Sequence, residues 1–168
     1  MTLVVEDGNG LADAESYVSA ADATDHVNKW RDSADWNGAS EADKERALRR
    51  ATRFVNAHRF IGFRAFEKQA LDWPRAHVGY VDGQEIFSDQ VPRRIREATI
   101  EAAIRDIEGD DLLTDHDSGT VRRLSQQVGS LSQTTEFAAP RKAGRQYEAI
   151  NALLKPFLAR GKLERSIA

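Results

Sequence analysis

Four histidines are the first candidates for chemistry, because imidazole can serve as an acid, a base or a metal ligand near neutral pH. They are His26, His58, His77 and His116. No two of them have the spacing of a metal-binding pair, and no serine lies in the glycine-flanked pattern of a catalytic nucleophile. We therefore expect no catalytic histidine.

A pair of carboxylates is the second candidate. Glu97 and Glu101 lie four residues apart, as two acidic catalysts on one helix face would. Glu101 and Arg105 have the same spacing, which favours an exposed ion pair on a solvated helix face. We adopt the ion-pair interpretation.

Two loops carry partial motifs. Residues 115–119, Asp-His-Asp-Ser-Gly, begin like a calcium-binding loop, but that loop needs an oxygen ligand and then a glycine where Gly119 and Thr120 stand. Gly8-Asn9-Gly10 does not follow a strand with the length or the spacing of a phosphate-binding loop. We therefore expect no enzyme, no metal site and no cofactor.

A basic helix followed by aromatic residues is the strongest binding pattern. Arg46, Arg49, Arg50 and Arg53 lie on one face of a helix that the apolar spacing predicts. The aromatic residues that follow are Phe54, Phe60, Phe63, Phe66 and Trp73. Such interleaving is typical of a groove for single-stranded nucleic acid. It also fits a solvated arginine face beside core-facing aromatics, which the place of Phe54 on or beside the apolar stripe favours.

The stretch 70–111 is the predicted core of the fold. Trp73 precedes Pro74, which favours an extended backbone, and an indole held this way usually packs at a core edge. The alternative is a stacking platform for a nucleic-acid base. Pro92 opens a helix whose apolar residues cover more than half its circumference, which is typical of a central helix. The predicted structural core is Trp73, Pro74, Pro92, Ile100 and Ile104.

The other predicted elements complete a mainly α fold: a small helical bundle with a short β hairpin and extended N- and C-terminal arms. From the N-terminus, they are a strand over 2–6, a helix after Ser19 with Val27 and Trp30 facing the core, a loop over 32–38 from which Trp36 packs inward, and a helix after Ser40. An irregular or extended connector over 60–66 and a turn over 79–85 follow. The last two are a hairpin at about 121–137 and a helix over 147–158 that Pro156 kinks or ends. We expect one helical domain over 1–158 and a basic tail over 159–168.

Composition restricts the setting of the chain. It has 168 residues, no cysteine and a net charge of -3, so disulfides and thiolate metal sites are excluded. No apolar run suits a signal peptide or a membrane span, so we expect no membrane association.

The charge alternates along the chain. Residues 1–45 carry 3 basic and 11 acidic side chains, residues 46–75 carry 8 and 2, residues 76–120 carry 4 and 11, and residues 141–168 carry 7 and 2. Such alternation is unlike one dominant basic DNA-binding face. It fits contacts with other proteins or with further copies of the chain, and it also fits ordinary solvated surface.

Four stretches together resemble a tailed-phage family. They are residues 3–18, residues 47–54, Ala70-Leu71-Asp72-Trp73-Pro74-Arg75, and Val91-Pro92 through Glu97-Ala98. The family is described as DnaT-like single-stranded DNA-binding protein. The chain also resembles the adaptor, or head-completion, proteins that bind beneath the portal. The resemblance extends over most of the chain, including residues 147–158.

The resemblance implies a structural virion protein, located in the neck and assembled in the host cytoplasm. It would form a ring with itself, a dodecamer by expectation, between the portal protein and the stopper or tail-completion protein. Double-stranded DNA would pass through the ring without sequence specificity. The alternative function is a single-stranded DNA-binding protein of replication type.

Site residues follow from this implied role. The portal-binding candidates are Lys155, Arg160, Lys162, Leu163 and Arg165 in the basic C-terminal segment. The candidates for contact with a neighbouring subunit or with DNA are Arg46, Arg49, Arg50, Arg53, Arg122 and Arg123. The hairpin over 121–137 is the candidate for the channel lining or the tail-side contact.

Overall fold

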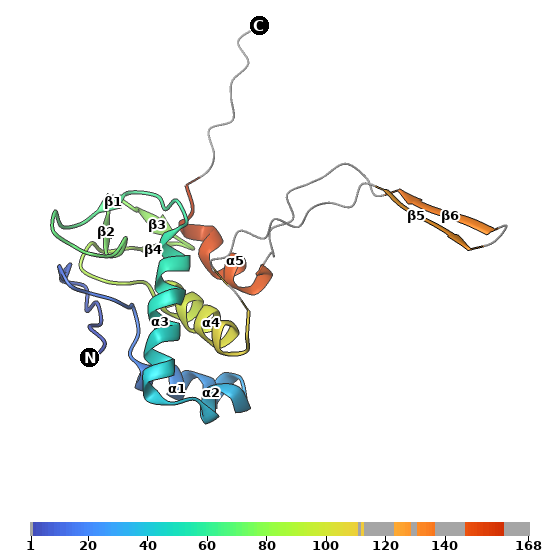
Figure 1. The fold of residues 1–168 in the computed structure, drawn as a ribbon. Helices are drawn as coiled ribbons and strands as arrows, with labels where there is room; N and C mark the ends of the chain where they lie inside the picture. The colour runs from blue at the N-terminus through green and yellow to red at the C-terminus, as the bar shows by residue number, and fades with distance from the viewer. Residues whose placement is uncertain (1, 111, 113–122, 129–130, 137–146, 160–168) are drawn as a thin grey trace, which may run out of the picture. The chain divides into compact units, whose positions relative to one another are not determined.

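The computed structural model describes residues 2–110, 112, 123–128, 131–136 and 147–159. The chain divides into two units, Met1–Leu113 with Glu148–Ala168 and Thr114–Tyr147. The first unit holds α1 to α5 and two very short hairpins, and the second holds one longer hairpin (Figure 1). The prediction of a mainly α fold with a short β hairpin is confirmed.

Three helices begin at serine caps. They are α1 (Ala20–Trp30), α2 (Ala34–Gly38) and α3 (Glu41–Asn56). The side chains of Ser19, Ser33 and Ser40 accept hydrogen bonds from the backbone N–H of Asp22, Trp36 and Asp43. Each cap satisfies a donor that the first helical turn leaves without a partner. The loop expected over 32–38 therefore contains a short helix, and Trp36 is fully buried as expected.

Trp30 is a correction to the expected core. Its side chain is 71% exposed, whereas Val27 is fully buried. The buried stripe of α1 consists of Ala20, Ala23 and Val27, and the helix ends at Trp30. Arg31 then leaves the helix in an extended conformation, so the stripe has no further turn on which Trp30 could pack.

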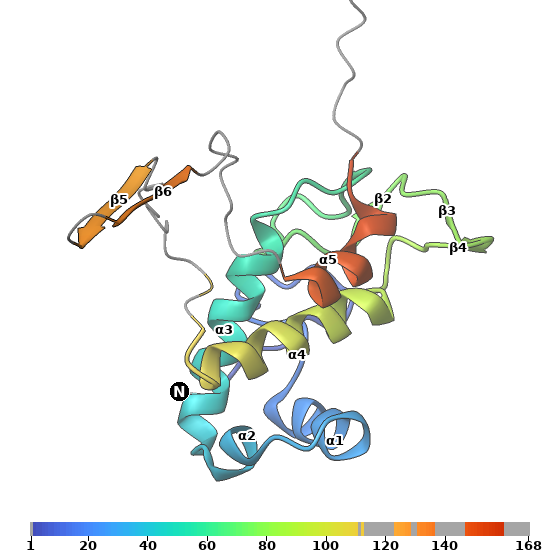
Figure 2. The ribbon, with the colours of Figure 1, turned by 90° about the vertical axis from the view of Figure 1, so that its right-hand side faces the viewer.

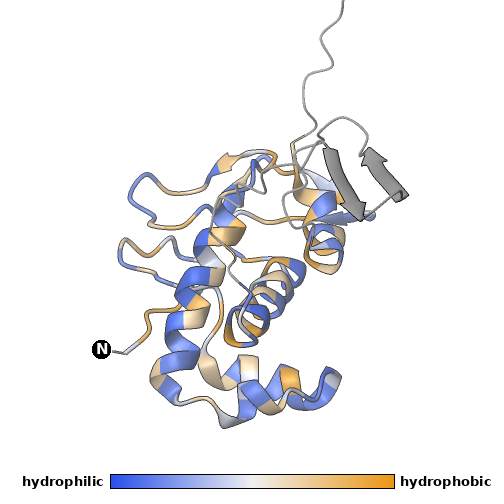
Figure 3. Cartoon of the chain, turned by 45° about the vertical axis from the view of Figure 1, so that its right-hand side comes forward, coloured by the Kyte–Doolittle hydropathy of each residue, from blue (hydrophilic) through white to orange (hydrophobic). Residues whose placement is uncertain are grey.

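The central helix is α4 (Arg93–Ile107), with Pro92 at its N-cap. Its buried residues lie on several sides, which is why the sequence is apolar around more than half of it. α3 packs against α4, and α5 (Glu148–Leu154) covers α4 from another side (Figure 2). Each of these helices carries both hydrophilic and hydrophobic residues (Figure 3). Trp73, Pro74, Pro92, Ile100 and Ile104 are all buried.

The chain after α5 closes onto the connector that follows α3. A 3-10 turn, η1 (Lys155–Phe157), contains Pro156 at the point where the α-helical hydrogen bonds end. Phe60 and Leu158 form an antiparallel bridge, Ile61 donates a hydrogen bond to the Phe157 carbonyl, and Ala159 donates one to the Arg59 carbonyl. These bonds fix the position of Ala159, the last described residue.

Two hairpins with strands of only two residues lie between α3 and α4. β1 (Phe63–Arg64) pairs with β2 (Arg75–Ala76), and β3 (Tyr80–Val81) pairs with β4 (Gln84–Glu85), both antiparallel. The expected turn at Asp82-Gly83 is present, with φ angles of 51° and 78°. Positive φ at both central residues is the backbone that such a hairpin turn requires.

The strand expected over 2–6 is reduced to one parallel bridge between Val5 and Ser16. The reason is the side chain of Glu6, which is buried and accepts hydrogen bonds from the backbone N–H groups of Gly8, Gly10 and Leu11 at 2.9 Å each. This carboxylate bends the chain into a compact loop directly after the bridge. A longer ladder would need the backbone to continue straight.

The second unit contains β5 (Arg123–Val128) and β6 (Leu131–Glu136), paired antiparallel from Arg123↔Glu136 to Val128↔Leu131. These strands lie inside the range of 121–137 expected for the hairpin. Residues 160–168 of the expected basic tail lie outside the described residues, and the division into 1–158 and 159–168 stays a prediction. Among the helices that the structure describes, none has both the length and the apolarity to cross a membrane.

Candidate functional site

The arginine face of α3, defined as Arg46, Arg49, Arg50 and Arg53, is largely paired with carboxylates of the same chain. Arg46 pairs with Asp43, and Arg50 lies 3.5 Å from Asp106 on α4. Arg49 lies 2.9 Å from Glu15 and 3.5 Å from Glu45. Arg53 is exposed and has no ion-pair partner within the described residues. Most of this positive charge is therefore paired within the chain.

The Arg49–Glu15 pair shifts both ionisation equilibria. The hydrogen bond from Arg49 lowers the pKa of the Glu15 carboxyl, and the hydrogen bond to Glu15 raises the pKa of Arg49. Both shifts favour the charged forms. The N-terminal segment is thus held to α3 by a pair that stays charged at neutral pH.

Trp73 lies inside the fold and offers no surface to a base. Its side chain is 0% exposed, and it makes edge contacts with Phe60 and Phe157, with ring centroids 5.7 Å and 5.4 Å away. Phe157 reaches it from the C-terminal 3-10 turn, so the connector after α3 and the end of the chain meet at this indole. The interpretation of Trp73 as a core residue accounts for these contacts, and the base-stacking interpretation does not.

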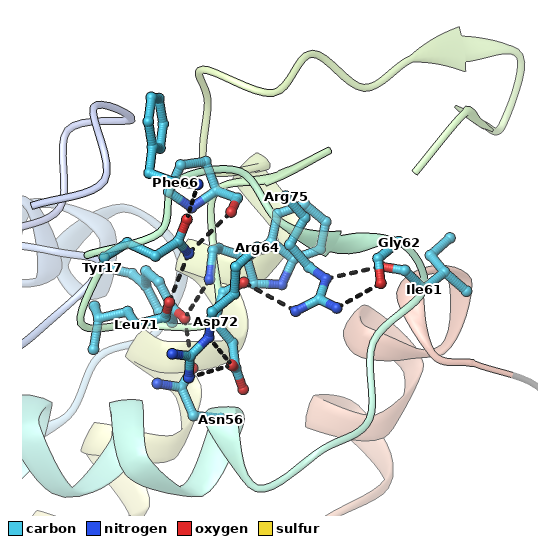
Figure 4. A network of polar contacts seen from close by, with 12 residues as sticks. Tyr17, Asn56, Ile61, Gly62, Arg64, Phe66, Leu71, Asp72 and Arg75 are labelled. Atoms are coloured by element: carbon cyan, nitrogen blue, oxygen red, sulfur yellow. Dashed lines mark hydrogen bonds and ion pairs between the residues drawn. The ribbon is translucent and has the colours of Figure 1, made fainter. Parts of the chain in front are cut away.

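A polar network surrounds the segment from Phe60 to Arg75 (Figure 4). The hydroxyl of Tyr17 donates to Asn56 and accepts from the backbone N–H of Trp73 at 3.1 Å. Burial raises the pKa of Tyr17 above that of an ordinary phenol, because the ionised form would lose its hydration. Tyr17 is therefore a neutral structural hydrogen-bonding group.

Arg75 and Gln69 hold the same segment through carbonyl groups. The Arg75 guanidinium donates to the carbonyl oxygens of Ile61, Gly62 and Asp72 at 2.8, 2.7 and 3.1 Å (Figure 4). The side chain of Gln69, which is buried, donates to the Leu71 and Pro74 carbonyls. These contacts explain how a segment with little regular structure keeps one conformation.

One set of exposed aromatic side chains lies in this segment, and a second set follows it in the chain. Phe63 and Phe66 lie in the chain beside Arg59, Arg64 and Lys68, and Phe63, 56% exposed, stacks on His77 at 4.7 Å. We name Arg59, Phe63, Arg64, Phe66 and Lys68 the basic aromatic edge. Arg64 also pairs with Asp72 at 3.0 Å.

The second set lies on what we name the acidic segment, residues 79–89. Tyr80 is 72% exposed and Phe87 is 58% exposed, and Asp82, Glu85 and Asp89 are exposed carboxylates. The sequence alone predicts a turn over 79–85 and no binding site in this segment. Its signal was the absence of Lys and Arg between residues 76 and 92, together with two aromatic residues around a hairpin turn.

The carboxylates on α4 are paired with arginines rather than with each other. Glu97 accepts from Arg93 at 2.7 Å, and Glu101 lies 2.8 Å from Arg105 and 3.2 Å from Arg31. Arg31 also reaches Glu108 at 2.7 Å. Arg31, Glu101 and Arg105 are half-buried rather than exposed, and the bonds of Arg31 to Glu101 and Glu108 fasten the end of α1 to α4. Across the described ranges, no group of three His, Asp or Glu side chains has the arrangement of a metal site.

A cleft of about 460 Å³ lies between the N-terminal segment and α4. Its lining includes Glu6, His26, Arg96, Glu97 and Ile100. It contains both positive and negative side chains, and its lining holds no nucleophile paired with a base. The cleft therefore adds no catalytic constellation.

The remaining predicted site residues fall in three places. Lys155 is exposed on η1, and Arg123 opens β5 opposite Glu136. The others lie outside the described residues: Arg122, Arg160, Lys162, Leu163 and Arg165. The structure thus places the four arginines on one helix, α3, and the predicted core residues together inside the fold. Of the predicted portal-binding residues, it describes Lys155.

Comparison with known proteins gives one result. A family model with the description "Putative DnaT-like ssDNA binding protein" matches residues 1–167. No match was found among curated proteins or among solved structures. Because the family model covers nearly the whole chain, the chain belongs to the DnaT-like single-stranded DNA-binding protein family.

Proposed function

We propose that the chain is a head–tail adaptor, a structural virion protein that forms a ring beneath the portal protein. In this role it extends the DNA channel and docks the stopper or the tail. The observation that carries the proposal is that the arginines and the tryptophan best suited to contact DNA make contacts within the chain instead. Arg46, Arg49 and Arg50 bind carboxylates of the same chain, and Trp73 is buried.

A groove for single-stranded nucleic acid needs free cations beside exposed aromatic faces. The arginine face and Trp73 were the parts of this sequence best suited to such a groove. Arg49 and Arg50 instead pair with Glu15 and Asp106 from other segments, and Trp73 is buried in the core. The exposed aromatics lie partly on an acidic segment, where phosphate groups would be repelled. Aromatic residues on a rigid surface instead suit contacts between proteins.

The C-terminal segment is the proposed contact with the portal. Residues 141–168 carry 7 basic and 2 acidic side chains. Ala159, from which the tail continues, is tied to the body by its hydrogen bond to the Arg59 carbonyl and by the neighbouring Phe60–Leu158 bridge. The tail therefore starts from a fixed point, as a docking arm requires. β5 and β6, rich in Ser, Thr and Gln, supply the proposed lining of the channel or the tail-side contact.

The test is binding to the portal protein of the same virus. The full chain and a variant without residues 160–168 are each mixed with portal rings and sedimented through a gradient. We expect the full chain to travel with the rings and the shortened chain to stay at the top. Because the deletion leaves Ala159 and its hydrogen bond in place, the circular dichroism and melting of the shortened chain should match those of the full chain. Equal binding by both chains would refute the tail as the portal contact.

A second candidate function is the binding of single-stranded DNA. Two observations favour it: the family description and the basic aromatic edge, where Phe63 and Phe66 are exposed beside basic residues. Base stacking on such rings is worth about 1–3 kcal/mol per base. The test is fluorescence anisotropy of a labelled oligonucleotide across a salt series. Salt-steep binding that Phe63→Ala weakens tenfold would support this candidate, and absence of binding at physiological salt would exclude it.

A further inference from the structure

The acidic segment is built as a rigid protrusion. Its turn is fixed by the positive φ angles at Asp82 and Gly83, and Ile86 donates a hydrogen bond to the Gly79 carbonyl. The side chain of Val81 is buried, and Asp82 pairs with Arg94 of α4 at 2.8 Å. The two large rings of the segment are nevertheless exposed. Large apolar side chains held in water on a fixed hairpin are typical of a contact surface.

The acidic segment also lacks internal charge compensation. Asp82 is paired, whereas Glu85 and Asp89 have no ion-pair partner within the described part of the chain. No Lys or Arg occurs between residues 76 and 92. A partner for this surface should therefore carry positive charge, with groups that can also lie over Tyr80 and Phe87.

The arginine face has those properties. Arg46, Arg50 and Arg53 follow one exposed stripe of α3, at intervals of four and three residues. Arginine binds carboxylates through two parallel hydrogen bonds, and its flat guanidinium stacks on aromatic rings. Arg53 has no partner inside the described part of the protomer, and the pair formed by Arg46 lies on the surface.

The two surfaces lie at opposite ends of α4 and cannot meet within one copy. Arg94 binds the acidic segment near the start of α4, and Asp106 faces Arg50 of the arginine face near its end. Twelve residues of helix separate these contacts by about 18 Å. Figure 2 shows α3 and the β3–β4 hairpin on opposite sides of the body.

From this arrangement we propose that the acidic segment of one copy docks on the arginine face of a second copy. Because the two surfaces differ, the contact is head-to-tail, and each copy keeps one free surface of each kind. Repetition of such a contact closes a ring when the rotation between copies allows it. The inference rests on the proposed ring and names the residues that hold it together.

The test exchanges the charges of the two surfaces. Variant A carries Glu85→Lys with Asp89→Lys, and variant B carries Arg46→Glu with Arg53→Glu. All four side chains are exposed, so both variants should keep the melting temperature of the wild type to within a few degrees. Sedimentation velocity over a concentration series at low salt then measures self-association of the wild type, of each variant alone and of their mixture.

We expect the wild type to associate, and each variant alone to lose about a hundredfold in association constant, because like charges then face each other. The mixture should recover, since a basic segment of A fits an acidic face of B, and the two unchanged surfaces also fit each other. A folded mixture that stays monomeric would overturn the interface, as would a wild type that stays monomeric throughout.

Portal binding of the same proteins separates this inference from the proposed function. A chain that binds the portal but associates regardless of the charge exchange would refute the interface and leave the adaptor role standing. A chain whose association follows the charge exchange, but which ignores the portal, would refute the adaptor role and leave the interface standing.

Discussion

The hydroxyl group of Tyr17 joins three segments that are far apart in the sequence. It bonds the side chain of Asn56 at the end of α3 and the backbone N–H of Trp73 in the connector. Tyr17→Phe leaves both of these groups without their partner. We expect it to lower the free energy of unfolding by about 1–3 kcal/mol, because an unsatisfied buried polar group is costly. Urea denaturation measures this, and a change below the fitting error would contradict it.

The same tyrosine gives the protein a predicted alkaline weakness. Its pKa is raised in the folded state, whereas in the unfolded chain it ionises near its ordinary value of about 10. Below that pH both states keep the proton, and the contribution to stability is complete. Above it only the unfolded state releases the proton, so the free energy of unfolding falls by up to about 1.4 kcal/mol per pH unit.

Denaturation at a series of pH values from 8 to 11 would measure this slope. Tyr17→Phe should show a shallower decline than the wild type, because it removes one of the groups that titrate there. Identical slopes in the two proteins would mean that Tyr17 is not protected from ionisation in the fold.

Gly8 shows where the backbone admits no side chain. Its φ angle is 107°, and a Cβ atom there would lie 2.1 Å from the carbonyl oxygen of Asp89. We expect Gly8→Ala to lower the free energy of unfolding by about 1–3 kcal/mol or more through strain and the close contact. The matched control is Gly38→Ala, because a Cβ at Gly38 meets no atom within 4 Å. Equal denaturation midpoints for the two variants would contradict this account of the N-terminal loop.

Among the elements, the connector that contains Trp73 stabilises the packing of the chain's end against its middle. Trp73 contacts Phe60 before β1 and Phe157 after α5, so it links the middle and the end of the chain. We expect Trp73→Ala to cost about 3–5 kcal/mol, as for other buried tryptophans. Trp30→Ala serves as the control, since Trp30 is mostly exposed and should change stability by about 0.5 kcal/mol at most. Similar losses from both substitutions would show that burial is not the cause.

The longer helices and the Asp82-Gly83 turn could be predicted because their signals are local, whereas the short helix α2 was expected to be a loop. Ser19 and Ser40 cap their helices as expected, and Pro92 opens α4. The exposure of Trp30 and the short extent of the strand over 2–6 could not be predicted, because both depend on which residues lie next to them in space. The side chain of Glu6 bends the segment after the Val5–Ser16 bridge, and no periodicity in the sequence records that contact.

The candidate site was only partly predictable for the same reason. The arginines of α3 could be placed on one face by their spacing, but their partners Glu15 and Asp106 come from distant segments. The acidic segment could not be predicted as a candidate contact surface, because that interpretation depends on the exposure of Tyr80 and Phe87, which only the fold determines. Membership of a family described by single-stranded DNA binding came from the resemblance, and the match over residues 1–167 confirms it.

At the scale of the whole molecule, a packed helical body carries the surfaces that we propose as contacts. The core around α4 positions the arginine face at one end and the acidic segment at the other. The C-terminal tail continues from Ala159, which is held to the body. The proposed portal contact and the proposed contact between copies thus use different residues, so we expect substitutions to remove one without the other.

The most direct measurement lets portal rings and single-stranded DNA compete for the chain in one mixture. The chain is mixed with portal rings and a fluorescent single-stranded oligonucleotide at physiological salt, and the mixture is sedimented through a gradient. If the chain is a head–tail adaptor, it moves into the fractions that contain portal rings, while the oligonucleotide stays near the top with no protein bound. A chain that stays with the oligonucleotide and leaves the portal rings bare would contradict it.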